Sequence, residues 1–252
     1  MLSIAILLIT VLLLVTSLYQ IRILKRVNVK LIKLVSPERD VRRIAKAQSD
    51  AAWQHYRQSE FYAQLLRLLN LSAPIPSTRS WAASPDVLLT LLDLAKSSKP
   101  TRILDLGSGM STLVLAKSAP QATIISIDNS AEFAGKTKKL LETHGVTNVD
   151  LRVAPLTPHR SGVEWYDLSK FEDISHIDLL FVDGPPGSKN LKARHPAIAE
   201  CVAKLNPRAI VVIDDAGRDG EKDMAHEFAK ALPNHSLEFL SHEKGTAVLL
   251  PR

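Results

Sequence analysis

The chain has 252 residues, of which 46% are hydrophobic and 23% are charged, and its formal net charge is +6. This length suits one domain of ordinary size with an appendage, and the hydrophobic content excludes a wholly disordered chain. The single cysteine, Cys201, excludes an internal disulfide and fits a reducing compartment.

Residues 1–21 carry no charged side chain and consist mostly of Leu, Ile and Val. A helix of about 20 such residues spans a bilayer core of roughly 30 Å, so we expect a single-pass membrane anchor here. A cleaved signal peptide is the alternative, but the sequence has neither basic residues before the apolar run nor a small-residue cleavage site. A buried soluble helix is a third interpretation, which the lack of a polar face disfavours.

The positive charge is concentrated in residues 22–80, which hold 12 Lys and Arg against four Asp and Glu, a net +8. The remainder, 81–252, has a net charge of −2, so the basic character does not indicate a nucleic-acid-binding domain. We expect 22–80 to be a basic juxtamembrane helical segment that ends in a linker at 71–77. Such a segment suits an anionic cytoplasmic leaflet and places the rest of the chain in the cytoplasm. A merely solvated helix face is the alternative.

From residue 81 onward, short apolar runs alternate with amphipathic stretches, after a helix that begins at Ser84-Pro85. Strands are expected at 102–106, 123–128, 149–154, 177–183 and 209–214. Helices are expected at 110–118, 130–144, 194–205 and 220–231. Apolar runs at 237–241 and 246–250 flank a turn and indicate a hairpin. The pattern predicts a doubly wound, Rossmann-like, mostly parallel α/β sheet that ends in an antiparallel hairpin and spans 81–252.

The first of these strands runs through a loop with two glycines, Gly107 and Gly109, directly into a helix. Glycines let the backbone approach a ligand, and the helix directs its free N–H groups to the same place. Asp128 ends the next strand, 19 residues after Gly109, where an acid would bind ribose hydroxyls. A plain tight turn and a helix-capping acid are the alternatives. Because Thr112 occupies the third glycine position of the dinucleotide-binding pattern, a cofactor with a pyrophosphate is disfavoured.

Taken together, four segments resemble the ordered motifs of class I S-adenosylmethionine-dependent methyltransferases. They are Ile103–Gly109, Ile127–Asp128, Phe181–Gly184 and Val212–Asp215. The resemblance covers about 81–252 and implies a seven-stranded sheet with S-adenosylmethionine as the cofactor. It also implies a set of cofactor-binding residues at the strand ends: Asp105, Gly107, Ser108, Gly109, Asp128, Asn129 and Asp183.

The resemblance also assigns places on the cofactor. Gly107 and Gly109 would lie under its methionine part, Asp128 on its ribose and Asp105 near its amino group. Residues 154–156 depart from the family, because they offer no acid near the adenine.

Asp183, Asp214 and Asp215 end two strands that should be neighbours, so their carboxylates are expected to converge. Three close carboxylates repel one another, and Mg²⁺ is a hard cation that prefers oxygen ligands. The pattern is similar to metal-dependent O-methyltransferases of catechols or sugars, in which equivalent acids bind a metal that activates the acceptor hydroxyl. The alternative is that Asp183 contacts cofactor or substrate while Asp214 and Asp215 cap a loop. Both interpretations stay open.

The sequence defines the catalytic base less clearly. The catechol enzymes place a lysine three residues after the first metal acid, and the sugar enzymes place an acid two residues after it. This chain has Pro186 and Pro185 at those positions. The candidates are therefore Asp183, Lys189 and His195, with an ordinary solvated or hydrogen-bonded role as the alternative for the last two.

The expected function is S-adenosylmethionine-dependent methyl transfer at the cytoplasmic membrane face, favouring O-methylation of a small-molecule, sugar or lipid-linked acceptor. No nucleic-acid partner is expected, because 183–187 lacks the aromatic residue that amine-methylating nucleic-acid enzymes use. A membrane-tethered scaffold with a degenerate cofactor fold is the alternative. Retention of both glycines, Asp128 and the later acids argues against it. An aminopropyl transferase is disfavoured by the lack of an acidic polyamine pocket.

Overall fold

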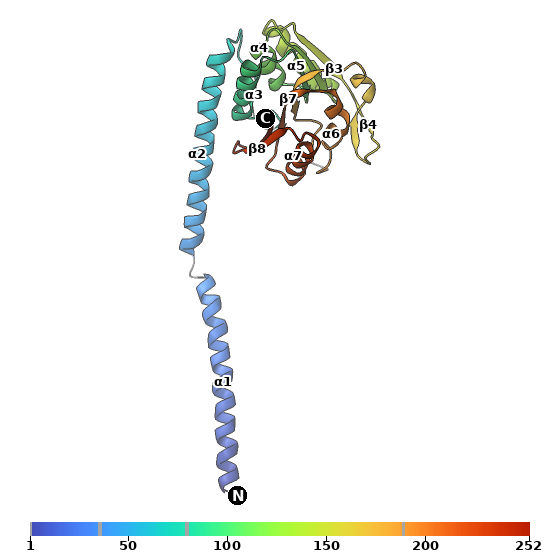
Figure 1. The fold of residues 1–252 in the computed structure, drawn as a ribbon. Coiled ribbons are helices and arrows are strands. Elements are labelled where there is room, and N and C mark those ends of the chain that lie inside the picture. Colours follow the sequence, from blue (N-terminus) through green and yellow to red (C-terminus); the bar gives the residue numbers. More distant parts are fainter. Residues whose placement is uncertain (1, 35–36, 79–80, 188–189) are drawn as a thin grey trace. The chain divides into compact units, whose positions relative to one another are not determined.

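The computed structural model describes the backbone of every residue except 1, 35–36, 79–80 and 188–189; the side chains of 2–8, 33–34 and 37–39 are also outside the description. Within these limits the chain divides into two compact units, Met1–His55 and Tyr56–Arg252. Figure 1 shows the ribbon of both. Each unit is described by itself below.

The first unit contains helix α1 (Leu2–Leu34) and the larger part of helix α2 (Pro37–Leu69). Its described apolar side chains are exposed; Leu12 and Leu14 are each 64% accessible. A search of the described residues finds no helix that is both long enough and apolar enough to cross a membrane. The prediction of a transmembrane anchor at 1–21 is therefore not supported, although residue 1 and the side chains of 2–8 lie outside the described range.

The second unit is built on a sheet of seven described strands in the order β3-β2-β1-β6-β7-β9-β8. The strands are β1 (Arg102–Leu106), β2 (Thr123–Asp128), β3 (Val149–Val153), β6 (Ile177–Val182), β7 (Leu205–Asp214), β8 (His235–Leu240) and β9 (Thr246–Pro251). Strand β9 runs antiparallel to β7 and β8, and the other pairs are parallel. The predicted Rossmann-like sheet with a terminal antiparallel hairpin is confirmed.

Helices connect these strands: α3 (Pro85–Ser98), α4 (Met110–Ser118), α5 (Ala131–Thr143), α6 (Pro196–Cys201) and α7 (Asp219–Ala231), with short 3₁₀ turns at Leu168–Phe171 and Val202–Lys204. Between β3 and β6, where no helix or strand is predicted, β4 (Leu156–Pro158) and β5 (Glu164–Tyr166) form a small antiparallel sheet.

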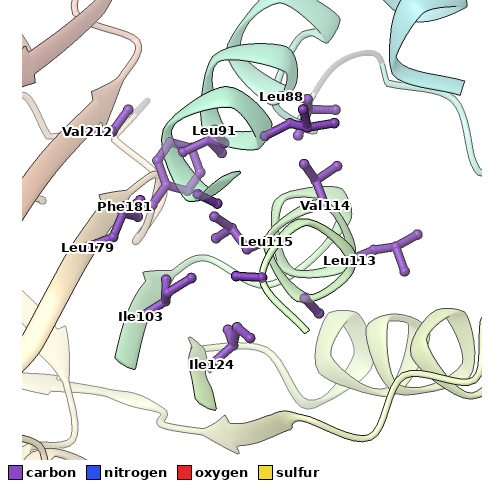
Figure 2. Packing of buried hydrophobic residues seen from close by; sticks show 14 of the residues in the cluster. Leu88, Leu91, Ile103, Leu113, Val114, Leu115, Ile124, Leu179, Phe181 and Val212 are labelled. Atoms are coloured by element: carbon purple, nitrogen blue, oxygen red, sulfur yellow. The ribbon is translucent and has the colours of Figure 1, made fainter. Parts of the chain in front are cut away.

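The central strands β1, β2 and β6 are buried on both faces, which explains why they read as continuous apolar runs. Successive side chains of a strand point to opposite faces. In β6, Leu179 and Phe181 therefore join one core cluster, while Leu180 and Val182 join the other. Figure 2 shows the first cluster, with Leu91 of α3 and the leucines of α4 beside side chains of the strands.

The last turns of α2 belong to the second unit, because Leu65 and Leu69 are buried in its core. Asp86, at the start of α3, is 3% exposed. Its carboxylate accepts hydrogen bonds from Gln58 Nε2 of α2 at 2.7 Å and from the backbone N–H of Glu243, between β8 and β9, at 2.8 Å. One buried acid thus ties α2 and the terminal hairpin to α3.

Four neighbouring strands of the parallel part, β2-β1-β6-β7, end at the same edge of the sheet. The register pairs Leu106 with Ile127 of β2 and with Val182 of β6, and pairs Val182 with Ile213 of β7. The residues that follow these positions therefore form one row. That row contains the glycine loop and the predicted acids.

Candidate active site

The glycine loop is closely packed on one side and open on the other. Gly107 has φ +108°, and a Cβ there would lie 3.2 Å from the backbone N of Gly184 and 3.6 Å from the Cβ of Asp183. Gly109 precedes α4 with φ +154°, a conformation that L side chains rarely adopt, and a Cβ there would meet no atom within 4 Å. The backbone can thus approach a ligand at Gly109, beside the first N–H groups of α4.

Asp128, at the end of β2, faces this loop. Its Oδ2 accepts hydrogen bonds from Ser108 Oγ at 2.6 Å and Ser108 N at 3.2 Å, and its Oδ1 accepts one from Ser130 N at 2.8 Å. A carboxylate has about four acceptor sites, so one remains for a ligand hydroxyl. The structure brings Ser108, Asp128 and the half-buried Asn129 together with the loop. Cofactor binding by these three residues stays a prediction.

Asp105, near the end of β1, lies beneath the start of α4. Its side chain is fully buried and accepts hydrogen bonds from the hydroxyls of Thr112 at 2.6 Å, Ser126 at 3.1 Å and Ser111 at 3.3 Å. Burial raises the pKa of Asp105 to about 7 even though these hydroxyls favour its charged form. The carboxylate thus holds the start of α4 against β1 and β2, and its predicted place near a cofactor amino group stays a prediction.

The acids at the ends of β6 and β7 converge as predicted, but an arginine lies among them. Arg194 Nη2 is 3.2 Å from Asp183 Oδ1 and 3.1 Å from Asp215 Oδ2. Among the described residues, no group of three or more His, Cys, Asp or Glu side chains is arranged to hold a metal ion. The predicted Mg²⁺ site at Asp183, Asp214 and Asp215 does not fit this geometry, because the guanidinium of Arg194 lies between the carboxylates of Asp183 and Asp215.

This cluster has strongly shifted pKa values. Burial and, next, the charge of Asp214 raise the pKa of Asp183 well above its ordinary range. Burial and the neighbouring Asp215 raise the pKa of Asp214 to about 6. Although burial opposes its charge, the carboxylates of Asp183, Asp215 and Glu221 hold the pKa of Arg194 above its ordinary value. Asp183 is thus a carboxyl group with raised proton affinity beside the glycine loop.

The structure describes only one of the other two candidate bases, His195. Lys189 lies outside the described residues. His195 is half-buried and precedes α6, where its side chain makes no capping hydrogen bond. Its neighbour Arg194 makes the contact with Asp183 instead. Of the two candidates that the structure describes, Asp183 is the one that adjoins the glycine loop.

Two residues of the site were not predicted from the sequence. Arg194 is the first residue of the helix predicted at 194–205, and nothing in the local sequence indicates that its charged side chain is buried. Tyr166, on β5, is 1% exposed, and its hydroxyl has no hydrogen-bond partner in the described part of the chain. A Cβ at Gly184 would overlap this hydroxyl, which places Tyr166 directly against the residue after Asp183. Burial raises the pKa of Tyr166 well above its ordinary value, so its hydroxyl stays protonated and available as a donor.

Two family profiles match this chain. One, described as a methyltransferase domain, matches residues 104–216, and the other, described as protein-L-isoaspartate(D-aspartate) O-methyltransferase, matches residues 28–158. A search of curated proteins gives no match.

Solved structures with the same fold include a Podospora anserina methyltransferase bound to SAH, with 16% identity, a TM-score of 0.55 and coverage of 82% of this chain and 95% of that one. A putative caffeoyl-CoA O-methyltransferase from Staphylococcus aureus has 15% identity, a TM-score of 0.54 and coverage of 81% and 98%. The O-methyltransferase TomG from Streptomyces achromogenes, in complex with SAM, has 21% identity, a TM-score of 0.52 and coverage of 77% and 88%. At these identities the likeness concerns the fold.

Proposed function

Because this chain belongs to the class I S-adenosylmethionine-dependent methyltransferases, we propose that it methylates an oxygen atom of a small-molecule, sugar or lipid-linked acceptor. The observation that carries the proposal is the place of Asp183. Its carboxyl group is the partly exposed acid of the site, with 15% of the side chain accessible, and it adjoins Gly107 of the glycine loop.

The residues at the strand ends fit S-adenosylmethionine. The open side of Gly109 admits a ligand close to the backbone, and Asp128 retains acceptor capacity for a ribose hydroxyl. When bound, the cofactor supplies an electrophilic methyl group on a sulfonium. Tyr166 contributes a buried hydroxyl that has no hydrogen-bond partner among the described residues, and its ring contacts that of Trp165 at a centroid distance of 4.9 Å.

Asp183 is proposed as the general base. A carboxylate with a raised pKa binds a proton more tightly, and burial together with the charge of Asp214 raises the pKa of Asp183 well above its ordinary value. The ionised carboxylate would accept the proton of the acceptor hydroxyl as the oxygen is methylated. Arg194 would hold the carboxylate in place through its 3.2 Å contact with Oδ1. No metal ion takes part in this proposal.

Cofactor binding by the full chain tests the proposal first. Titration calorimetry should give saturable heat with S-adenosylmethionine and with its demethylated product. Asp128→Ala should weaken binding about tenfold or more, because a hydrogen bond to a charged group contributes about 1.5–3 kcal/mol. Asp223→Ala, an exposed acid on α7, is the matched control and should bind as the unaltered chain does. Absence of heat would favour a scaffold over an enzyme.

A panel of phenols, sugars and lipid-linked alcohols then tests the acceptor. Formation of the demethylated cofactor should depend on an acceptor hydroxyl. Methylation confined to nitrogen or sulfur acceptors would contradict O-methylation while leaving cofactor binding intact.

We also propose that α1 brings the protein to the cytoplasmic face of an anionic membrane. Its apolar residues, such as Leu12, are exposed, and the bases that follow are exposed as well: Arg22, Lys25, Arg26 and Lys30. Exposed apolar side chains next to a basic cluster suit the boundary between lipid headgroups and acyl chains. A lipid-linked acceptor would be reached from this position.

Flotation with lipid vesicles tests this location. The full chain should bind vesicles rich in phosphatidylserine much more tightly than neutral ones. Each base contributes about 1 kcal/mol near such a surface, so replacing all four by Gln should weaken binding on the order of 10³-fold. The matched control replaces four exposed lysines of the second unit: Lys138, Lys139, Lys222 and Lys230. Equal loss in both variants would show a non-specific charge effect and contradict the proposal.

A further inference from the structure

We propose that Arg194 takes the place of a divalent cation among the acids at the ends of β6 and β7, so that it positions Asp183 and frees the reaction from a metal. This inference rests on the proposed function for the role of Asp183. The replacement of a cation by Arg194 stands on the geometry of the cluster alone.

The contacts of Arg194 are those of a central cation. Its guanidinium lies 3.2 Å from Asp183 and 3.1 Å from Asp215, with Glu221 at 3.8 Å. It also donates to the backbone carbonyls of Pro185 at 3.1 Å and Asp214 at 3.3 Å. Oxygen atoms from the segment after β6, from the end of β7 and from α7 thus surround one positive charge.

The burial of Arg194 means that its positive charge needs these carboxylate partners. Arg194 is 4% exposed, and an unpaired guanidinium at such a place would be costly. The planar fork of an arginine can satisfy several oxygens in fixed directions, which a lysine ammonium cannot do. A hydrated Mg²⁺ ion could not reach the same oxygens without displacing this side chain.

Two other cations, Arg218 and Lys244, act on the same acids. Arg218, 42% exposed, lies 3.0 Å from Asp215 and 3.5 Å from Glu221. The positive charge of Lys244, in the turn before β9, acts on both Asp183 and Asp214. Arg194 is the cation that contacts Asp183 directly and is itself buried.

Within the described cluster, the exposed fraction of each side chain indicates which residue can contact the acceptor. The side chains of Arg194 and Asp215 are each 5% accessible and that of Glu221 is 3%, whereas Asp183 reaches 15%. Asp183 is therefore the residue of the cluster that can contact an acceptor, and Arg194 contacts Asp183 from the buried side. Arg194 is a positioning residue in this sense.

The test begins with the unaltered full chain. Its melting temperature should be the same in EDTA as in millimolar Mg²⁺ or Mn²⁺, and so should turnover with any acceptor found. A melting temperature or a rate that falls in EDTA and recovers on addition of the metal would overturn the proposal.

Arg194→Ala should convert the cluster into a cation site. Mn²⁺ at about a hundred times its dissociation constant should raise the melting temperature of this variant on the order of 5 °C. Arg218→Ala is the matched control, because it removes a cation from the same acids but leaves Arg194 in place. It should show no Mn²⁺ response. A response equal to that of Arg194→Ala, or none in either variant, would overturn the replacement.

Arg194→Lys keeps the charge and covers the case in which the alanine variant does not fold. It should remain insensitive to Mn²⁺, because a cation still occupies the cluster. Its kcat should fall about tenfold or more while KM for S-adenosylmethionine is unchanged, since the lysine cannot orient Asp183 in the same way. Unchanged kcat would overturn the positioning role. The melting measurements need no cofactor, so they are independent of a failure of the proposed methyl transfer.

Discussion

Asp183→Asn is expected to lower kcat by about 10²- to 10⁴-fold, the usual contribution of a general base. The amide keeps the shape of the side chain and an oxygen that can accept the hydrogen bond from Arg194, but it cannot take up a proton. Binding of S-adenosylmethionine should change little. Initial rates of demethylated cofactor formation, with calorimetry on the same samples, measure both quantities.

Asp215→Asn is the matched control for this result. It removes a carboxylate from the same cluster and from the same Nη2 atom of Arg194, but its side chain is 5% accessible against 15% for Asp183. Its effect on kcat should be clearly smaller. If both variants lose activity equally, Asp183 has no special role as the base.

The pH dependence gives a second measure of the same group. Burial and Asp214 raise the pKa of Asp183, and a base must be ionised to act, so activity should be lost as the pH falls through this raised pKa. The loss should occur above the ordinary range of aspartate, near 4. The residual activity of Asp183→Asn should lack this limb. A limb that persists in the variant would assign the base elsewhere.

Gly184→Ala is expected to disrupt the cofactor loop more than any other single methyl addition at the site. The new Cβ would overlap the hydroxyl of Tyr166 and lie 3.2 Å from Cα of Gly107. Overpacking of this kind costs about 1–3 kcal/mol of folding free energy. The melting temperature should fall by roughly 2–4 °C per kcal/mol, and binding of S-adenosylmethionine should be lost because Gly107 is displaced.

A double variant separates the two contacts. Tyr166→Phe removes the overlapping hydroxyl and, alone, should change stability little, because that oxygen has no partner among the described residues. In the Gly184→Ala background it should restore part of the melting temperature. Gly135→Ala on α5 is the control for adding a methyl group, since its Cβ meets nothing within 4 Å; it should be neutral or slightly stabilising. Additive effects of the two site changes would contradict the steric explanation.

Much of the second unit follows from local pattern. The strands 102–106 and 123–128 are observed with the predicted bounds, because buried parallel strands are short apolar runs with sharp ends. Strand β7 begins at Leu205 rather than 209, and α6 spans Pro196–Cys201 rather than 194–205. Pro196, at the start of α6, is a helix-start signal that the predicted bounds did not use.

Site residues that follow the ends of strands could be predicted from the sequence. Site residues whose partners are distant in sequence could not. Asp128 and the glycine loop meet because β1 and β2 are neighbours. Asp105 shares the sheet face of Ile103, under α4, so period-two alternation could have placed it away from the ligand edge. Arg194 could not be placed in this way, because its partners lie 11 to 27 residues away in sequence.

The hydrogen bonds of Asp86 make the last turns of α2 inseparable from the enzyme. A protein shortened to its methyltransferase motifs at the proline-containing linker would keep every strand-end acid. It would nevertheless uncover the core where Leu65 and Leu69 pack and would leave Asp86 without Gln58. Insertions and deletions before Tyr56 should therefore leave the fold of the second unit intact, whereas those between Tyr56 and Leu69 should destabilise it.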